Sequence, residues 1–371
     1  MEESVGVSNT STLPEYIPKA VRIADAVILL CISLTGIIGN ILTSVAYILS
    51  HKLRTKTNIF VINLAIADFL TCLFLPFVSW SLVKDVVYIE PQFDIICGFV
   101  IAAITMFAST SIILLFSIAV NRYVLITRSH QEYERFYRTR NIAIWLFVSW
   151  TYPFLVNLVP LLFGVGHLGF DIKIHACGAR TDHEHSHLYD LLVVIAFVPM
   201  PFLVTVCYLG IYFHIRRHNR RMVSYNLSLL RRRSCSQNDP RSSRSAGSKT
   251  DKSKTREIAP NHLAINRNLF LVLVIYMVCL SPHIIGEIVN APYYVILHTR
   301  IIVACNSCLN PIIYGVKHPH FRQVFKSIIL RQWSEIPQPA YKWMAASQQA
   351  HSHDVKMSTH VTLNPGVETT P

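Results

Sequence analysis

Long apolar runs dominate this sequence of 371 residues. Each is near the roughly 20 residues that an α-helix needs to cross a bilayer's hydrocarbon core, which argues for a polytopic membrane protein. We therefore predict an all-α fold, a seven-transmembrane helix bundle spanning residues 24–317 in total. The predicted spans cover residues 24–50, 57–82, 96–127, 141–163, 188–216, 263–290 and 297–317.

The composition agrees with a membrane protein and argues against a nucleic-acid-binding protein. Hydrophobic residues make up 52% of the chain and charged residues only 15%, whereas a soluble protein carries about 25% charged residues. The net charge of +13 could indicate a nucleic-acid partner. However, the basic residues crowd into alternate connecting segments, as the positive-inside rule describes. The charge pattern thus indicates membrane orientation, and no nucleic acid is expected as a partner.

The orientation follows from these basic loops. The segments after the first, third and fifth spans are rich in Lys and Arg, so they are predicted to be cytoplasmic. Residues 1–23 then form an extracellular N-terminus, in which Asn9 begins a glycosylation acceptor sequence. Residues 1–19 lack the apolar core of a signal peptide, so the first helix would itself direct insertion.

Three segments are predicted to lie in the cytoplasm outside the spans. Residues 222–260 are rich in Ser, Arg and Lys and should form a disordered third loop. Residues 318–330 place apolar side chains at helical spacing and should form a short amphipathic eighth helix that contacts membrane lipids. Residues 331–371 are expected to form a disordered tail.

Polar residues inside the spans need an explanation, because an ionisable group at the helix centre costs about 2.5–3.5 kcal/mol on insertion scales. Asp68 lies in the middle of the second span, and other polar groups lie at a comparable depth. Together they could hold a sodium ion and water, or they could only clamp the helices together. The set comprises Asn40, Asp68, Ser111, Asn306 and Asn310.

Nine short motifs are spread along the predicted spans and loops. They are Gly39-Asn40, Asn63-Leu64-Ala65 with Asp68, Cys97, Asn121-Arg122-Tyr123, Trp150, Cys177, Tyr208, Cys279 with Pro282, and Asn310-Pro311-Ile312-Ile313-Tyr314. A single motif would be weak, but nine in this order are specific. In these motifs the chain resembles the rhodopsin-like G-protein-coupled receptors over about 300 residues, all seven spans.

The resemblance implies roles for these residues. Cys97 and Cys177 would form a disulfide, and Arg122, between Asn121 and Tyr123, would meet a heterotrimeric G protein, with the Gi/o type favoured. Tyr208 and Tyr314 would move toward Arg122 on activation. Pro282 and Pro311 would kink the sixth and seventh helices. Arrestin and receptor kinases would be further partners, and the plasma membrane would be the location.

The chain also departs from the superfamily pattern. Asn121 stands where most members have Asp, Leu280 where a Trp is usual, and Tyr276 where a Phe is usual. No acid is suitably placed near the sixth span to pair with Arg122, since the nearest, Glu257, lies in the loop. A weak resting lock of this kind would raise basal activity.

Within the superfamily the chain most resembles melatonin receptors and related invertebrate receptors. The shared residues are Asn121-Arg122-Tyr123, Phe170-Asp171, Val198-Pro199-Met200, Cys207-Tyr208-Leu209 and Asn306-Ser307-Cys308-Leu309-Asn310. Pro160 and Ala196 stand where that family places the Asn and His of its ligand site, which argues against melatonin as the ligand.

The ligand pocket is predicted from polar and apolar residues in the outer halves of the spans. Aminergic receptors have an Asp in the outer third of the third helix, where this chain has Ile104, so a monoamine ligand is not expected. Arg300 could bind an anionic head group, or it could reach lipid head groups or pair with Glu287. The extracellular ligand would be a small molecule or a lipid. The candidates are Ile104, Thr105, Phe107, Asn157, His283, Glu287, His298 and Arg300.

Three alternate histidines, His183, His185 and His187, precede the fifth span. In an extended chain they would point the same way and could bind zinc or titrate near pH 6.5. A solvated polar loop is the alternative interpretation.

Two other function classes are alternatives to a signalling receptor. A transporter with Asp68 lining its path is disfavoured, because the chain has no internal repeat. A scavenging receptor that does not signal stays open because of Asn121 and Leu280. No enzyme is expected, since the sequence has no phosphate loop, nucleophile elbow or HExxH motif. No cofactor is expected apart from the allosteric sodium ion.

Overall fold

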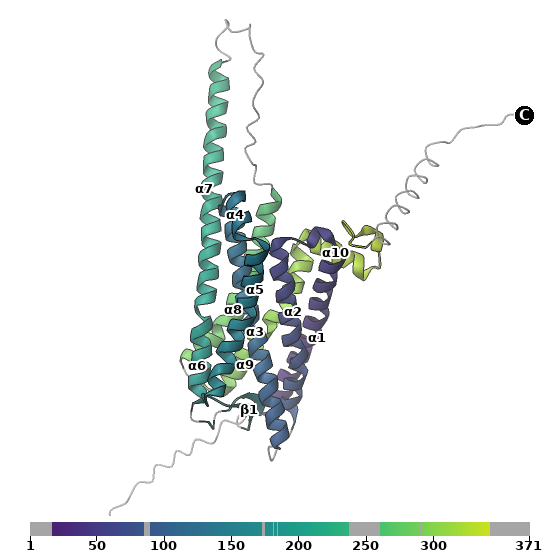
Figure 1. The fold of residues 1–371 in the computed structure, drawn as a ribbon, viewed down its shortest axis with the longest axis vertical. Coiled ribbons are helices and arrows are strands. Elements are labelled where there is room, and N and C mark those ends of the chain that lie inside the picture. Colours follow the sequence, from purple (N-terminus) through teal and green to yellow (C-terminus); the bar gives the residue numbers. More distant parts are fainter. Residues whose placement is uncertain are drawn as a thin grey trace, which may run out of the picture.

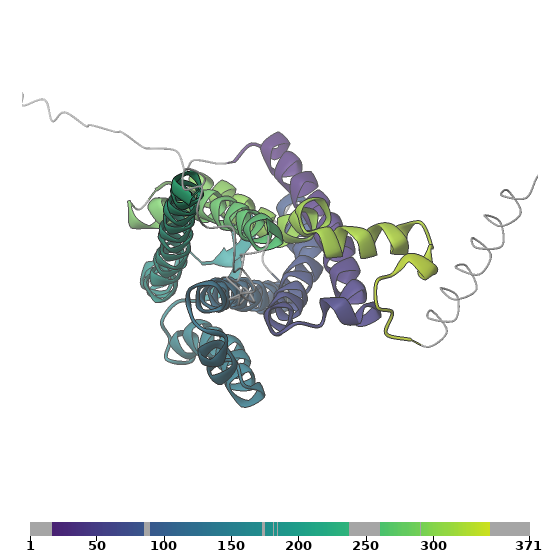
Figure 2. The same ribbon diagram turned by 90° about the horizontal axis from the view of Figure 1, so that it is seen from above.

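The helices of the bundle run along a common axis in the computed structural model (Figure 1), which describes residues 17–84, 90–172, 175–180, 182–183, 185–236, 260–289 and 291–341. Seen from above, they lie side by side as a bundle (Figure 2). They are α1 (Lys19–Leu49), α2 (Lys56–Val83), α3 (Pro91–Thr127), α5 (Thr139–Leu162), α6 (Ser186–Phe197), α7 (Pro199–Ser236), α8 (Pro260–Ile288) and α9 (Tyr293–Lys317).

The described helices have the length and apolar surface of membrane spans. Six are long and apolar enough to cross a bilayer, with α6 and the first part of α7 counted as one, and Val274–Ile288 of α8 adds a shorter apolar stretch. Large apolar side chains also face outward: Leu34, Ile38, Phe147 and Phe202 are between 60% and 69% exposed. An apolar surface of this kind is typical of a helix surrounded by lipid and is unfavourable in water. The predicted all-α bundle is confirmed.

The fifth span consists of two helices because proline interrupts it. Helix α6 ends at Phe197 and α7 begins at Pro199. Proline has no amide hydrogen, so it cannot donate the bond that would continue the first helix.

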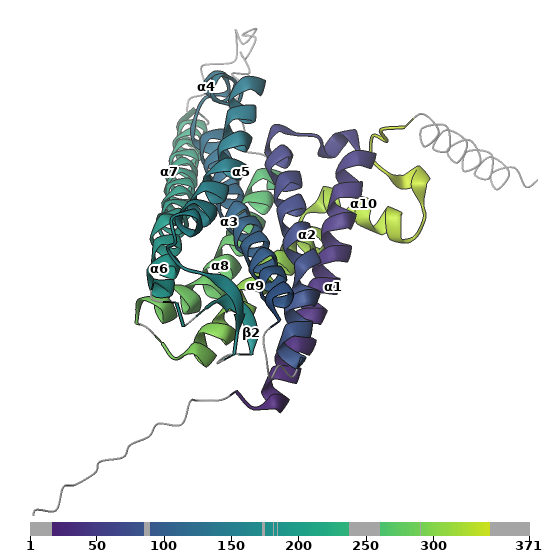
Figure 3. The ribbon, with the colours of Figure 1, turned by 60° about the horizontal axis from the view of Figure 1, so that its bottom comes forward.

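Helix α3 gives the bundle two chemically distinct ends. Cys97 lies near its start and Arg122 lies near its last turn, so we call these the Cys97 end and the Arg122 end. A two-stranded antiparallel hairpin, β1 (Leu168–Asp171) and β2 (Ala176–Ala179), lies across the Cys97 end (Figure 3), with Phe170 opposite Cys177. Sequence analysis did not predict this hairpin, since its strands are only four residues long and buried throughout, without alternation.

Two short helices lie at the Arg122 end. Helix α4 (His130–Phe136) begins with a capping box, in which Ser129 and Glu132 satisfy each other's backbone amides. Helix α10 (Pro319–Ile329) projects sideways from the bundle (Figure 2). It buries Phe321, Val324 and Phe325 against the bundle while Arg322 stays exposed. The predicted amphipathic eighth helix is thereby confirmed.

The structure corrects two boundaries predicted from the sequence. Helix α7 continues to Ser236, so the start of the predicted disordered loop, residues 222–236, is helical. Leu, Met and Arg in this stretch favour continuing a helix that is already nucleated. The first helix begins at Lys19 rather than residue 24. Residues 237–259, Glu257 among them, and Asn9 lie outside the described residues.

A further correction concerns the start of the predicted disordered tail. Residues 332–341, here called the return segment, fold back onto the first loop of the bundle (Figure 3). The His51 amide donates to the Gln338 carbonyl at 2.9 Å and the Ala340 amide to that of Leu49 at 2.9 Å. The Ser50 hydroxyl donates to the Pro337 carbonyl at 2.5 Å. Ile336 is fully buried beneath these bonds, so this part of the predicted disordered tail is ordered.

Candidate functional site

The hairpin at the Cys97 end is fixed to α3 by covalent and polar contacts. Cys97 and Cys177 form a disulfide with their Cα atoms 5.2 Å apart. Asp94, one turn earlier, accepts the Phe170 amide at 2.8 Å and Arg180 Nη1 at 3.2 Å. Arg180 also binds Asp182, which lowers the pKa of the Asp182 carboxyl. The segment between α5 and α6, which contains the hairpin, is thus held against the bundle.

Two glycines allow this close approach. A Cβ atom on Gly169 would lie 2.2 Å from Asp94 Oδ1, and one on Gly98 would lie 2.5 Å from the Leu168 carbonyl oxygen. Only glycine leaves room for the backbone of β1 to lie directly on α3.

A cavity of about 220 Å³ lies beneath the hairpin. Helices α3, α6, α8 and α9 contribute most of its wall, and most of its lining side chains are aliphatic. Five residues predicted from the sequence line it: Ile104, Thr105, His283, Glu287 and Arg300.

The polar side chains of this cavity gather at the hairpin side. Arg300 Nη2 lies 3.1 Å from Asp190 Oδ2 and 3.4 Å from Glu287 Oε1, so Arg300 joins α6, α8 and α9. His283 Nδ1 lies 3.3 Å from the Thr299 hydroxyl and 3.9 Å from Glu287 Oε1. Of the alternatives for Arg300, the structure shows pairing with Glu287.

Three predicted pocket residues do not line this cavity. The Phe107 ring lies against Phe74 and Trp150. The amide of Asn157 donates to the Pro153 carbonyl at 2.8 Å, and His298 Nε2 pairs with Asp25 of α1 at 3.4 Å. Each lies on a different face of its helix, because residues that are close in sequence point in different directions around a helix.

Asp190 and Tyr189 also line the cavity, although neither was among the predicted pocket residues. Asp190 lies near the start of the predicted span 188–216, and an acid inside an apolar run is a signal of function. Its place at the edge of the run made it look like part of the solvated loop.

The structure does not assemble the three histidines into a metal site. The His183 ring lies 6.2 Å from those of His167 and His185. The described residues include no group of three or more metal-binding side chains that could hold an ion. The chain turns here instead of staying extended, so alternate side chains do not converge.

Midway along the bundle, Asp68 is fully buried and joins three helices. It accepts the Ser111 hydroxyl at 2.7 Å and the Asn310 amide at 2.8 Å. The side-chain amide of Asn40, in α1, donates to the Ser307 carbonyl of α9 at 2.9 Å. The side-chain oxygens of Asn40 and Asn306 are buried without a hydrogen-bond partner among the described residues. The cluster therefore offers a buried carboxylate and spare oxygens, the ligands that hard cations prefer.

At the Arg122 end, Asn121 connects three elements. Its side-chain oxygen accepts the Thr57 hydroxyl at 2.6 Å, and its amide nitrogen donates to the Tyr133 hydroxyl at 3.4 Å. An amide does both, whereas a carboxylate would only accept. Asn121 thus ties α3 to α2 and to the short helix α4.

Three polar atoms in this part of the bundle are buried without a hydrogen-bond partner among the described residues: Arg122 Nε, the Tyr314 hydroxyl and the hydroxyl of Tyr276, which belongs to the same buried cluster as Tyr314. Tyr208 is also buried, and the Tyr123 ring lies so close to Gly210 that a Cβ there would be 2.7 Å away. Buried polar groups without partners are costly, so these atoms would gain free energy from a new partner.

Comparison with known proteins decides the family. The sequence model described as "7 transmembrane receptor (rhodopsin family)" matches residues 39–314. The chain belongs to this family. The match includes the predicted motifs from Gly39 to Tyr314.

The relatives of this rhodopsin-family receptor include melatonin receptors. Melatonin receptor type 1A of Phodopus sungorus is 29% identical, with 82% of this chain and 80% of that protein covered. The G-protein coupled receptor moody of Drosophila melanogaster is 26% identical over 88% of this chain. The chain spans only about half of moody, 54% of its length. The squid rhodopsin crystal structure shares the fold, with a TM-score of 0.67 at 18% identity over 90% of this chain and 92% of that one.

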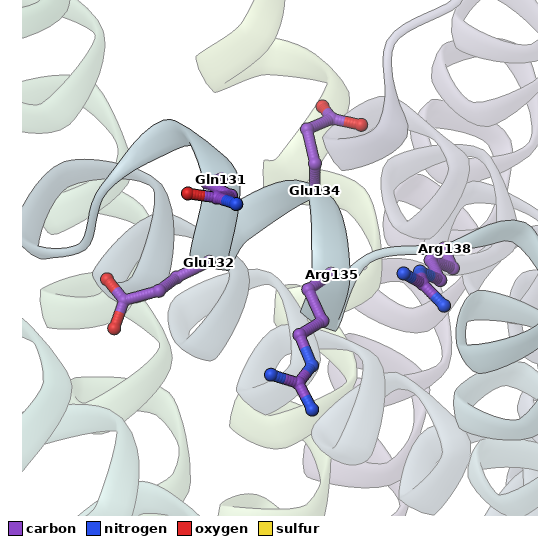
Figure 4. Close-up of a pocket in the computed structure, with 5 residues that line it drawn as sticks. All are labelled: Gln131, Glu132, Glu134, Arg135 and Arg138. Atoms are coloured by element: carbon purple, nitrogen blue, oxygen red, sulfur yellow. The ribbon is translucent and has the colours of Figure 1, made fainter.

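A surface groove of this receptor lies on α4, beside the Arg122 end. Figure 4 shows that the five side chains lining it point in different directions rather than toward one centre. Glu134 instead forms an ion pair with Lys56 of α2 at 2.6 Å. Side chains that do not converge suit a docking surface better than a small-molecule site. They are Gln131, Glu132, Glu134, Arg135 and Arg138.

Proposed function

We propose that this receptor binds a small extracellular ligand in the cavity beneath the hairpin and activates a heterotrimeric G protein of the Gi/o type. The Cys97 end would face outward at the plasma membrane and the Arg122 end would face the cytoplasm. One observation carries the proposal: the cavity and the unpaired buried groups around Arg122 lie at opposite ends of the same helices. The similarity to receptors named melatonin receptors supports it.

Helix α8 provides the link between the ends. His283 and Glu287 line the cavity, and Tyr276, two turns deeper, has its hydroxyl buried without a partner among the described residues. A ligand that prefers one position of α8 shifts the equilibrium between two states of the bundle. Movement of α8 would then give the Tyr276 hydroxyl and Arg122 new partners, including the G protein.

Further partners follow from the same proposal. Sodium would bind at Asp68 in the resting state, with Ser111 and Asn310 beside it, and the buried side-chain oxygens of Asn40 and Asn306 would be further candidate ligands. Arrestin and receptor kinases would act on the tail beyond α10, which is rich in Ser and Thr.

A receptor that binds ligand without signalling is the second candidate, favoured by Asn121 and Leu280, which depart from the superfamily pattern. In the structure Asn121 still joins α3 to α2 and α4, so its replacement of Asp leaves this end organised.

Nucleotide exchange by a purified Gi/o heterotrimer, with receptor in lipid nanodiscs, tests the proposal without a known ligand. The wild type should catalyse basal exchange, and Arg122→Ala should reduce it by at least about tenfold. Arg128→Ala, an exposed arginine at the same end, is the matched control and should keep the wild-type rate. Equal rates for wild type and Arg122→Ala would contradict a signalling role and favour the second candidate.

A further inference from the structure

The charges at the mouth of the cavity do not balance. Asp190, Glu287 and Arg300 come from three different helices and meet there, two carboxylates and one guanidinium. Their formal sum is one negative charge when both carboxylates are ionised and the nearby His283 and His187 are neutral. Buried charge is costly unless it is paired, so this end of the cavity favours an additional positive charge.

The geometry of Arg300 leaves both acids incompletely paired. A single nitrogen, Nη2, serves both carboxylates, at 3.1 Å and at 3.4 Å. A guanidinium binds a carboxylate most strongly through two parallel bonds, and among the described residues neither acid receives that arrangement. The side chain of Glu287 is only 10% exposed, so water cannot fully replace the missing bonds.

Away from the charged groups the cavity wall is mostly apolar, although the small polar residues Thr71, Thr105, Ser109 and Ser307 also line it. Ile104, Ile112, Val194, Leu280, Ile284 and Ile301 all line it. A matching ligand therefore carries its charge at one end and a hydrocarbon body at the other. With a volume of about 220 Å³, the cavity is smaller than the roughly 300–1,000 Å³ typical of sites for drug-sized molecules.

We propose that the cavity recognises a small aliphatic amine, whose ammonium group lies between Asp190 and Glu287 and whose hydrocarbon body fills the space toward Ile112. This inference rests on the proposed function, because it names the ligand class of the same site. It differs from recognition by the third helix, which offers Ile104 and no acid. An anion would meet Arg300 only where two carboxylates already surround it.

Such a ligand has a direct effect on the bundle. Arg300 bridges α6, α8 and α9 through the two carboxylates. An ammonium group that shares these carboxylates weakens the bridge, and α8 becomes freer to move relative to the other two helices. The amine therefore prefers the state in which the bridge is open.

Three probes of equal chain length separate charge from hydrophobicity: octylamine, octanoate and 1-octanol. Their binding is measured as the change in thermal unfolding temperature of the full-length receptor in nanodiscs, and their action as Gi/o nucleotide exchange. Octylamine alone should raise the unfolding temperature in a saturable manner. Asp190→Asn and Glu287→Gln should each weaken its apparent affinity about tenfold or more. Arg300→Gln should strengthen it, since a competing cation is removed.

Control variants separate the role of the two cavity carboxylates from general effects of charge and folding. Glu90→Gln removes an exposed acid on the same side of the molecule, outside the cavity lining, and should leave octylamine binding unchanged. Asp190→Glu and Glu287→Asp retain the charge and should recover part of the affinity if the Asn and Gln variants fold.

Two results would overturn the inference: octanoate binding that Arg300→Gln abolishes, or equal effects of 1-octanol and octylamine. Saturable octylamine binding without any exchange, basal or stimulated, would support the ligand class while removing the proposed function. Basal exchange that depends on Arg122 without any effect of octylamine would support the proposed function and reject the amine.

Discussion

At the scale of single residues, His318 shows how burial sets a charge state. It ends α9 and caps α10, where its Nδ1 accepts the Phe321 amide at 3.5 Å. Its ring lies 5.1 Å from that of Phe321. Burial, with a smaller contribution from the positive charge of Arg122, lowers the pKa of His318 from 6.5 to about 4. A neutral ring is required, because only an unprotonated nitrogen can accept the amide.

We therefore predict that docking of α10 weakens in acid. Between pH 6.5 and pH 4 the undocked state binds a proton that the docked state does not, so stability falls as pH falls, by up to about 3 kcal/mol. His318→Asn keeps an N-cap but does not titrate. Hydrogen exchange of α10 amides, corrected for intrinsic rates, should accelerate in acid for the wild type and for a control with the exposed His130→Asn. An equal pH dependence in His318→Asn would contradict the assignment.

At the scale of elements, the return segment joins the chain after α10 to the first loop. Its carbonyl and amide groups satisfy backbone groups at the end of α1, where a helix leaves its last carbonyls without intrahelical partners. Ile336 closes the contact and is fully buried. The contact makes α1, the first loop and α10 a single unit on the Arg122 end.

Removing the Ile336 side chain should detach this segment. Ile336→Ala should cost about 2–5 kcal/mol of local stability, since a buried side chain leaves a cavity. The amides of His51 and Ala340 should then exchange with solvent much faster, as measured by hydrogen–deuterium exchange. Ile329→Ala is the control, because Ile329 is 68% exposed and should leave both amides protected. Unchanged protection in Ile336→Ala would show that the backbone bonds alone hold the segment.

At the scale of the whole molecule, the buried Asp68 cluster lies between the cavity and the Arg122 end and contacts α3 and α9. An ion held there prefers whichever state keeps these helices in place. Coupling between such a site and a ligand site is reciprocal and typically about 1–3 kcal/mol.

Sodium should therefore stabilise the resting receptor and lower basal nucleotide exchange, compared with an organic cation at equal ionic strength. Asp68→Asn keeps the shape of the side chain, loses its charge and should abolish the difference between the two salts. Asp25→Asn, another buried carboxylate at the far end of α1, should preserve it. If the two salts give the same exchange in wild-type receptor, Asp68 is a structural clamp only.

The class of fold and the motif residues could be predicted from the amino-acid sequence alone. An apolar run of about 20 residues can satisfy its backbone in lipid as a helix, whatever its neighbours are. Span existence is therefore a local property, which is why the spans and the amphipathic α10 could be predicted. Asp68 was found because an ionisable residue is rare within such runs, whereas Cys97 and Arg122 were found through the motifs shared with the rhodopsin-like receptors.

Which side chains meet could not be predicted from the sequence, because it depends on how the helices pack together. Asp190 joins Arg300 and Glu287, while Phe107 and Asn157 point elsewhere, and these outcomes depend on how each helix is rotated about its axis. Spans that are apolar on all sides carry little periodic signal of the face that turns inward. The hairpin and the return segment depend on bonds between distant parts of the chain, such as His51 to Gln338. Local sequence patterns do not encode such partners, because packing of the whole bundle brings them together.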